Sequence, residues 1–144
     1  MSQSNSPNWL FWVAAIIFLL WNLMGCGMYL FDALASDAQY AESYGDAMVS
    51  LRAAYPAWAM AGYAVGVWGG LLAAIMFLLR KKMATPLFII SLLGALISNL
   101  WTVTSPVVKE AGGSGYWVMP VVITAIGLIE VWFSRKKAAA GVLN

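Results

Sequence analysis

The chain has no histidine and a single cysteine, Cys26, among its 144 residues. It therefore lacks the ligands for a zinc or other transition-metal cage and cannot form an intrachain disulfide. Charged side chains make up only 10% of the residues, against about 25% in soluble domains. We see no nucleophile–base pair, phosphate-binding loop or cofactor motif, and the net charge of +2 is no signal for nucleic acid. The sequence predicts a protein that is not an enzyme and has no metal or cofactor.

Apolar residues, by contrast, make up 62% of the chain, and the mean hydropathy is +0.80. Such a composition is typical of membrane proteins, and residues 58–79 alone, which carry no charge, would span about 33 Å as a helix. We predict an all-α membrane protein in contact with lipids, with one domain over residues 1–144 folded as an antiparallel bundle of four transmembrane helices. The expected spans are residues 9–31, 57–79, 87–103 and 116–133.

The first apolar segment could instead be a cleaved signal peptide, with Ala33-Leu34-Ala35 as the cleavage site. No lysine or arginine precedes it, and it is longer than the apolar region of a signal peptide. We therefore expect it to remain as the first transmembrane helix.

The positive charges predict the orientation of the bundle. Two triplets, at residues 80–82 and 135–137, follow the second and fourth spans, whereas the other connections hold only Arg52 and Lys109. Because cytoplasmic loops are enriched in lysine and arginine, both termini and the turn at residues 83–85 are expected in the cytoplasm.

The polar connection at residues 32–56 is then expected on the outer side, with one or two short amphipathic helices. Ser36 is a candidate N-cap, Tyr40 and Tyr44 are spaced to share a helix face, and Gly45 should break the helix. This connection is either a surface connector or a cap over a site between the helices. We expect residues 104–115 to form a loop that contains a flexible run at residues 112–115, and the tail after residue 137 shows no recognisable feature.

Small residues form a groove along the second span. Gly62, Gly66 and Gly70 recur every fourth residue and so lie on one helix face. In lipid, small residues let two helix backbones approach closely. The face either packs against the third span, where Ser91 and Gly94 belong to a matching small-residue surface, or binds a second copy or a partner protein. A pore lining is a less favoured interpretation, because a wet wall should carry more polar side chains.

Two amides and one carboxylate lie within the apolar spans. Asn22 and Asn99 are each roughly 18–20 Å from the start of their helix, so they could hydrogen-bond to each other. Alternatively they could form the polar floor of a ligand site, for which Trp21, Trp68 and Tyr63 are available as walls.

Glu130 is placed by the predicted boundaries about one turn from the cytoplasmic end of the fourth span. An anion is unfavourable at a helix C-terminus, so its presence there needs a reason. The candidates are an interfacial ion pair, with Arg80 within reach, and a titrating carboxylate that couples transport to protons.

Several stretches resemble a family of short bacterial four-helix inner-membrane proteins that has no established activity. They are LLWNLMG (residues 19–25), the P-A-W entry to the second span (56–58), its V-x-G-G core, the basic turn, and the ending W-x-S-R-K (132–136). The resemblance implies this fold and a bacterial inner-membrane location. Some members are labelled sugar transporters, and no catalytic or binding residues follow from the family.

Two functions therefore remain open. The first is a structural or accessory protein that acts through helix packing, as a homo-oligomer or within a larger membrane complex. The second is a small transporter or channel for a small solute, such as a sugar. Because we expect four helices to fill their own core, we predict its site between helices or, more readily, between protomers.

Overall fold

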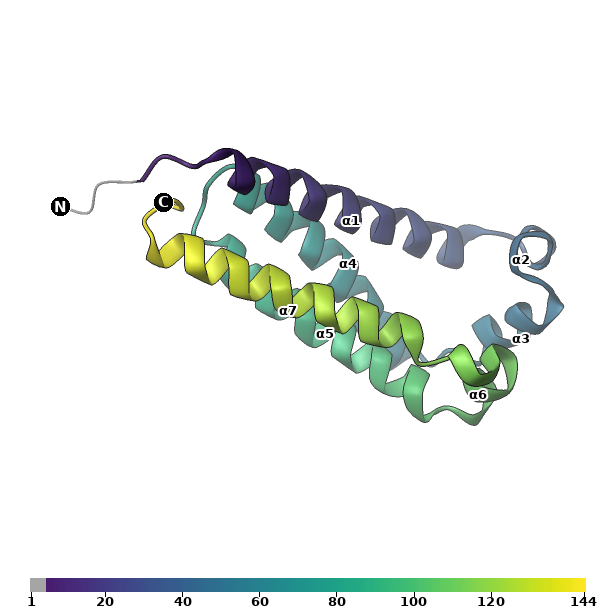
Figure 1. The fold of residues 1–144 in the computed structure, drawn as a ribbon. Helices are drawn as coiled ribbons and strands as arrows, with labels where there is room; N and C mark the ends of the chain where they lie inside the picture. The colour runs from purple at the N-terminus through teal and green to yellow at the C-terminus, as the bar shows by residue number, and fades with distance from the viewer. Residues whose placement is uncertain (1–4) are drawn as a thin grey trace.

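The computed structural model describes residues 5–144, which form helices and no strand (Figure 1). The predicted position of the N-terminus itself lies outside these residues. The elements are α1 (Trp9–Leu34), α2 (Asp37–Tyr44), α3 (Asp46–Ala54), α4 (Ala57–Leu78), α5 (Ala84–Thr104), α6 (Pro106–Gly112), η1 (Gly113–Gly115, a short 3₁₀ helix) and α7 (Val118–Ala139).

Four of these helices, α1, α4, α5 and α7, are long and apolar enough to cross a membrane. They lie lengthwise beside one another, with α2, α3 and α6 gathered at one end (Figure 1). We call this the loop end, and we call the opposite end, where residues 80–82 and 135–137 lie, the basic end. The prediction of an all-helical protein with four apolar spans is confirmed.

The helix ends differ from the predicted boundaries, most of all in α7. This helix begins at Val118 and continues through the basic triplet to Ala139, six residues beyond the expected end. Lysine, arginine and alanine are good helix formers, and cations near a helix C-terminus interact favourably with its dipole. α1 likewise continues to Leu34, and α5 begins at Ala84, before Pro86. The expected loop at residues 104–115 is also largely helical, because α6 and η1 lie within it.

The glycine face of α4 packs against α5 within the chain. A Cβ atom on Gly62 would lie 2.7 Å from the carbonyl oxygen of Gly94, and one on Gly66 would lie 3.3 Å from the backbone nitrogen of Ala95. The first distance leaves no room for a side chain, and the second would admit one only if α5 shifted slightly, so the two backbones are in close contact. Of the two interpretations of this face, the structure shows packing against the third span.

Five phenylalanines close the bundle in its basic half: Phe11, Phe18, Phe77, Phe88 and Phe133. All four spanning helices contribute, and neighbouring ring centroids lie between 4.7 and 6.2 Å apart. Aromatic pairs at such distances attract each other beyond simple burial. This phenylalanine layer separates the basic end from the middle of the bundle.

The tail after α7 has a structural role, although we recognised no feature in its sequence. Gly141 has a φ of 77°, and the Val142 amide donates to the Lys137 carbonyl, which is a Schellman helix ending. The turn directs Val142 and Leu143 into the core beside the phenylalanine layer, where they are 5% and 1% exposed. Two apolar residues after a glycine are the sequence signal for this docking.

Arg80 fastens the tail to the rest of the basic end. It occupies a left-handed conformation (φ 60°) after α4, where glycine is usual. Its guanidinium donates to the carbonyl of Val142 at 3.0 Å and to that of Asn5 at 3.1 Å. The segments before α1 and after α7 are thereby held against the α4–α5 turn.

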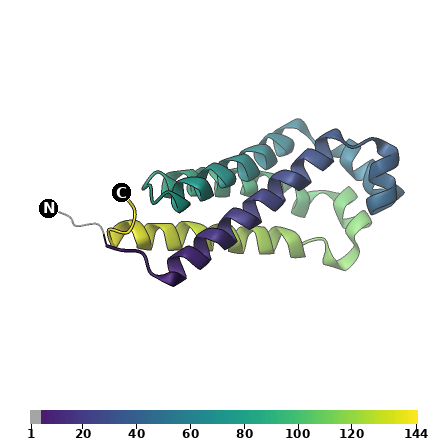
Figure 2. The same ribbon diagram turned by 90° about the horizontal axis from the view of Figure 1, so that it is seen from above.

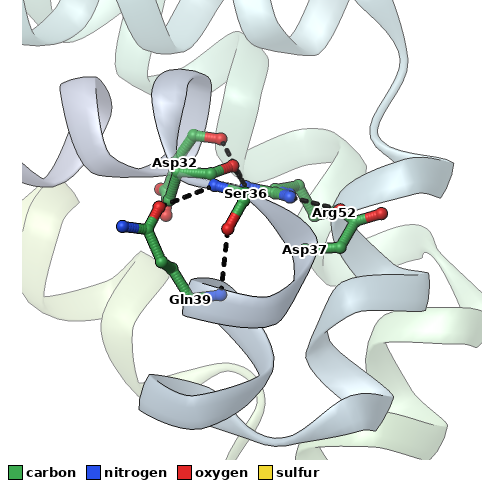
Figure 3. A network of polar contacts seen from close by, with 6 residues as sticks. Asp32, Ser36, Asp37, Gln39 and Arg52 are labelled. Carbon is green, nitrogen blue, oxygen red and sulfur yellow. Dashed lines mark hydrogen bonds and ion pairs between the residues drawn. The ribbon is translucent and has the colours of Figure 1, made fainter.

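At the loop end, α2 begins with a complete capping box (Figure 3). The Ser36 hydroxyl accepts a hydrogen bond from the backbone N–H of Gln39, and the side-chain oxygen of Gln39 accepts one from the backbone N–H of Ser36. Tyr40 and Tyr44 share a face, with ring centroids 5.0 Å apart, and Gly45 ends the helix with a φ of 93°. Burial is the main cause that raises the pKa of Tyr40, to about 12, so its hydroxyl is protonated at neutral pH.

Arg52 of α3 ties this end to the C-terminus of α1 (Figure 3). Its guanidinium donates to the carbonyls of Asp32 at 3.3 Å and Ala35 at 2.9 Å and pairs with Asp37 at 2.5 Å. It also lies 4.3 Å from the centre of the Tyr40 ring. Because Asp37 is exposed, the two carbonyl contacts should contribute more to stability than the ion pair.

We expect Arg52→Ala to lower the free energy of unfolding by about 1–2 kcal/mol, because it leaves carbonyls at the end of α1 without a donor. Unfolding can be followed in detergent by the labelling of Cys26, which is buried in the folded chain, with a fluorogenic maleimide. Arg135→Ala is the matched control, because Arg135 is exposed and makes none of these contacts. An equal loss in both variants would contradict the capping role.

Candidate functional site

A cavity of about 290 Å³ lies between the four spanning helices, on the loop side of the phenylalanine layer. In Figure 2, α1 runs obliquely across the bundle and separates from α7 toward the loop end. Residues of both helices line the cavity. Its lining residues are Trp21, Asn22, Met24, Gly25, Met28, Tyr55, Tyr63, Gly66, Val67, Ser91, Leu92, Ala95, Ser98, Asn99, Thr102, Met119, Pro120, Ile123, Gly127 and Glu130.

The floor of the cavity is a hydrogen-bonded pair of buried side chains from α1 and α7. The Asn22 amide donates to Glu130 Oε2 at 2.7 Å and to the Phe18 carbonyl at 2.8 Å. Asn22 is 6% exposed and Glu130 is 4% exposed. Both amide hydrogens of Asn22 are thus used, and one of them holds the carboxyl group in place.

Glu130 does not occupy the predicted position. Since α7 ends at Ala139, Glu130 lies about 14 Å from that end and near the middle of the helix. The expected ion pair with Arg80 is absent, because that guanidinium is bound to the carbonyls of Asn5 and Val142. Within residues 5–144 the one ion pair is that of Arg52 and Asp37.

The predicted pairing of Asn22 with Asn99 is also wrong. The Asn99 amide donates instead to α7, to the Pro120 carbonyl and the Thr124 hydroxyl, each at 3.2 Å. Both asparagines nevertheless line the same cavity, Asn22 at its floor and Asn99 on its wall. The alternative interpretation, a polar site between the helices, therefore describes their arrangement better.

Tyrosines supply further hydroxyl groups toward the loop end. Tyr55, in the connection between α3 and α4, hydrogen-bonds to the Ser98 hydroxyl, and Tyr63 of α4 donates to Asp32 at 3.1 Å. Asp32, near the end of α1, is thus a hydrogen-bonded, half-buried side chain. Burial raises the pKa of Tyr55, so its hydroxyl remains a donor at neutral pH.

Gly70 of α4 leaves room for the Asn22 amide at the floor of the cavity. A Cβ atom there would lie 2.1 Å from Asn22 Oδ1 and 2.9 Å from the Ser91 hydroxyl. The absence of a side chain therefore lets the Asn22 amide sit against α4. The third glycine of the α4 face thus serves the polar site as well as the packing.

Most of the predicted site residues come together, and the two exceptions are Trp68 and Gly62. Trp21, Asn22, Tyr63, Gly66, Asn99 and Glu130 all line the cavity, and Gly70 supports Asn22 from behind. Trp68 does not line it: its ring lies against Tyr29, with centroids 6.2 Å apart, and 42% of the residue is exposed. Gly62 serves packing alone.

Sequence reasoning missed the methionines of the site. Met24 and Met28 of α1 and Met119 of α7 line the cavity and are 51%, 42% and 50% exposed. They therefore mark its mouth, which opens sideways between α1 and α7. The spacing of Met24 and Met28 by one turn is their only signal, and it does not stand out in a segment that is apolar on every side.

The chain was compared with models of protein families, with curated proteins and with solved structures, and none of the three comparisons found a match. The resemblance to short bacterial inner-membrane proteins therefore stays a prediction.

Proposed function

We propose that this protein is a small membrane transporter that binds its solute in the cavity between α1, α4, α5 and α7. The observation that carries the proposal is the cavity itself, which has polar groups from three spanning helices at mid-bundle depth. In a protein that acts only through helix packing, apolar side chains would be expected to fill this space. The site is built within one chain, so no second copy is needed to complete it.

The glycine face of α4 also favours transport over the accessory function. The accessory function relied on a free small-residue surface on α4, and that surface is occupied by α5. A homo-oligomer or a larger complex would have to use other surfaces. No particular contact of the described residues favours such a partner, so transport is the better-supported proposal.

The two ends of the bundle suggest how the solute would pass. The cavity opens beside the loop end, whereas the phenylalanine layer and the docked tail close the basic end. The basic triplets support a cytoplasmic position for that end. The resemblance to short bacterial membrane proteins supports a bacterial inner membrane. Transport would then require α1 and α7 to separate at the phenylalanine layer, while the tight α4–α5 pair remains as the fixed part.

Flux into liposomes that contain only this protein tests the proposal. We would use three membrane-impermeant probes of different charge: glucose, benzyltrimethylammonium and benzenesulfonate. We expect at least one to enter faster than into protein-free liposomes. Ala95→Phe should abolish the difference while Cys26 stays protected from the maleimide as in the unaltered protein, because Ala95 lines the cavity and a phenyl ring would fill it.

Leu96→Phe is the matched control, because Leu96 is 40% exposed on the next position of α5 and lies outside the cavity lining. It should retain the flux. If none of the three probes enters faster than into protein-free liposomes, or if Ala95→Phe transports as well as the unaltered protein, the proposal is wrong.

A further inference from the structure

We propose that the solute is a small organic cation with an apolar body, which binds with its positive charge at Glu130 and enters through the methionine-lined mouth between α1 and α7. This inference rests on the proposed transport function and adds the substrate class. Three independent observations lead to it: the charges of the cavity, the nature of its walls and the position of its mouth.

The charges of the cavity have one sign. Glu130 is the only carboxylate among the lining residues, and no lysine or arginine lines the cavity. Its hydrogen-bond partner is the neutral Asn22 amide of α1, and Gly70 of α4 and the Ser91 hydroxyl of α5 lie beside that amide. A charged carboxylate that is 4% exposed and has only an amide partner is unfavourable, and a bound cation would remove that penalty.

The walls suit an organic cation better than a metal ion or a sugar. A metal site needs several anionic or thiolate ligands, and no cluster of such residues occurs in the part of the chain that the structure describes. The rings of Trp21, Tyr55 and Tyr63 line the cavity and can interact with a quaternary or protonated amine. A sugar would need many more hydrogen-bonding groups than these largely apolar walls provide.

The size and mouth of the cavity restrict the solute further. A volume of about 290 Å³ is at the lower end of the range, roughly 300–1,000 Å³, for small-molecule pockets. The mouth residues Met24, Met28 and Met119 are exposed on the lateral face of a membrane-spanning bundle. Flexible thioether side chains adapt to apolar groups of different shape. A cation with an apolar body can partition into the lipid interface and enter from there.

The test compares benzyltrimethylammonium with benzenesulfonate, two permanently charged aromatic probes of similar size and opposite sign, and with glucose as the neutral probe. Binding to the purified protein is followed by tryptophan fluorescence. It is also followed by the temperature at which Cys26 becomes accessible to the maleimide, which a bound ligand should raise. We expect the cation to bind at least about tenfold more tightly than the anion or glucose, and to be the probe that enters liposomes.

Glu130→Gln should reduce cation affinity about tenfold or more, because glutamine keeps the acceptor for Asn22 but not the charge. Glu130→Asp should retain part of the affinity. Glu110→Gln, at an exposed carboxylate of α6, is the matched control and should bind as the unaltered protein does. Cys26 labelling reports whether each variant is folded.

The outcomes separate the two proposals. If glucose or benzenesulfonate binds as tightly as the cation and is transported, the substrate class is wrong while the transport function stands. If Glu130→Gln is folded and binds the cation unchanged, the role of Glu130 is wrong. If no probe binds or enters liposomes, transport itself is overturned. The preference of the unaltered protein for one sign of charge needs no variant, so the substrate class remains testable if Glu130→Gln fails to fold.

Discussion

Replacing Asn22 by leucine should lower the free energy of unfolding by about 2–4 kcal/mol, one of the two largest effects that we expect in this protein. The variant removes the amide that donates to Glu130 Oε2 at 2.7 Å and leaves a carboxyl group that is 4% exposed without that partner. In the background Glu130→Met, where there is no carboxyl group to satisfy, the same replacement should have a much smaller effect. The difference between the two values is the coupling energy of the pair.

The control is a second double-mutant cycle, Asn22→Leu with Asn99→Leu. These side chains bind different groups, so their effects should add to within about 0.5 kcal/mol. Both cycles can be measured by titration of the folded protein with a denaturing detergent, with Cys26 labelling as the readout. Additive effects of the Asn22 and Glu130 substitutions would show that the hydrogen bond between them contributes nothing to stability.

Gly94→Ala should be the other severe substitution, at about 2–3 kcal/mol. A Cβ atom on Gly94 would lie 2.8 Å from the Gly62 carbonyl oxygen and 2.9 Å from the Gly66 backbone nitrogen. Backbone atoms cannot rotate away as the end of a side chain can, so α4 and α5 must move apart. In lipid, where the two helices are held mainly by close contact, this separation weakens the whole pair.

Gly27→Ala provides the comparison, because a Cβ atom on this α1 glycine would meet no atom within 4 Å. Alanine is the better helix former, so this variant should be as stable as the unaltered protein or slightly more stable. If Gly94→Ala and Gly27→Ala unfold at the same temperature, the close contact between α4 and α5 is not important for stability.

The parts of the fold that could be predicted are those that depend on local composition. Four long apolar runs predicted four spans, and the glycine period on α4 predicted the face that meets α5. Ser36 with Gln39 three residues later is a local capping signal that could be recognised in the same way. Each of these patterns is complete within a short stretch of sequence.

The parts that could not be predicted depend on how helices are rotated about their axes. In a soluble bundle the polar face would indicate the rotation, but α1 and α7 are apolar on both the lipid side and the inner side. The partner of Asn22 was therefore assigned by depth alone, which led to Asn99 rather than Glu130. Ending the fourth span at Phe133 also displaced Glu130 toward the cytoplasmic end, although α7 continues to Ala139.

The distance along the chain between Asn22 and Glu130 has a consequence for the order of assembly. The two residues are 108 positions apart, so a ribosome that adds about 5–20 residues per second makes Glu130 roughly 5–20 s after Asn22. During this interval α1 must reside in the membrane with an amide that lacks its final acceptor, while the α4–α5 hairpin can already form. The step that completes the site is then the arrival of α7, so a nascent chain halted before Glu130 would have the glycine-packed pair but no floor for the cavity.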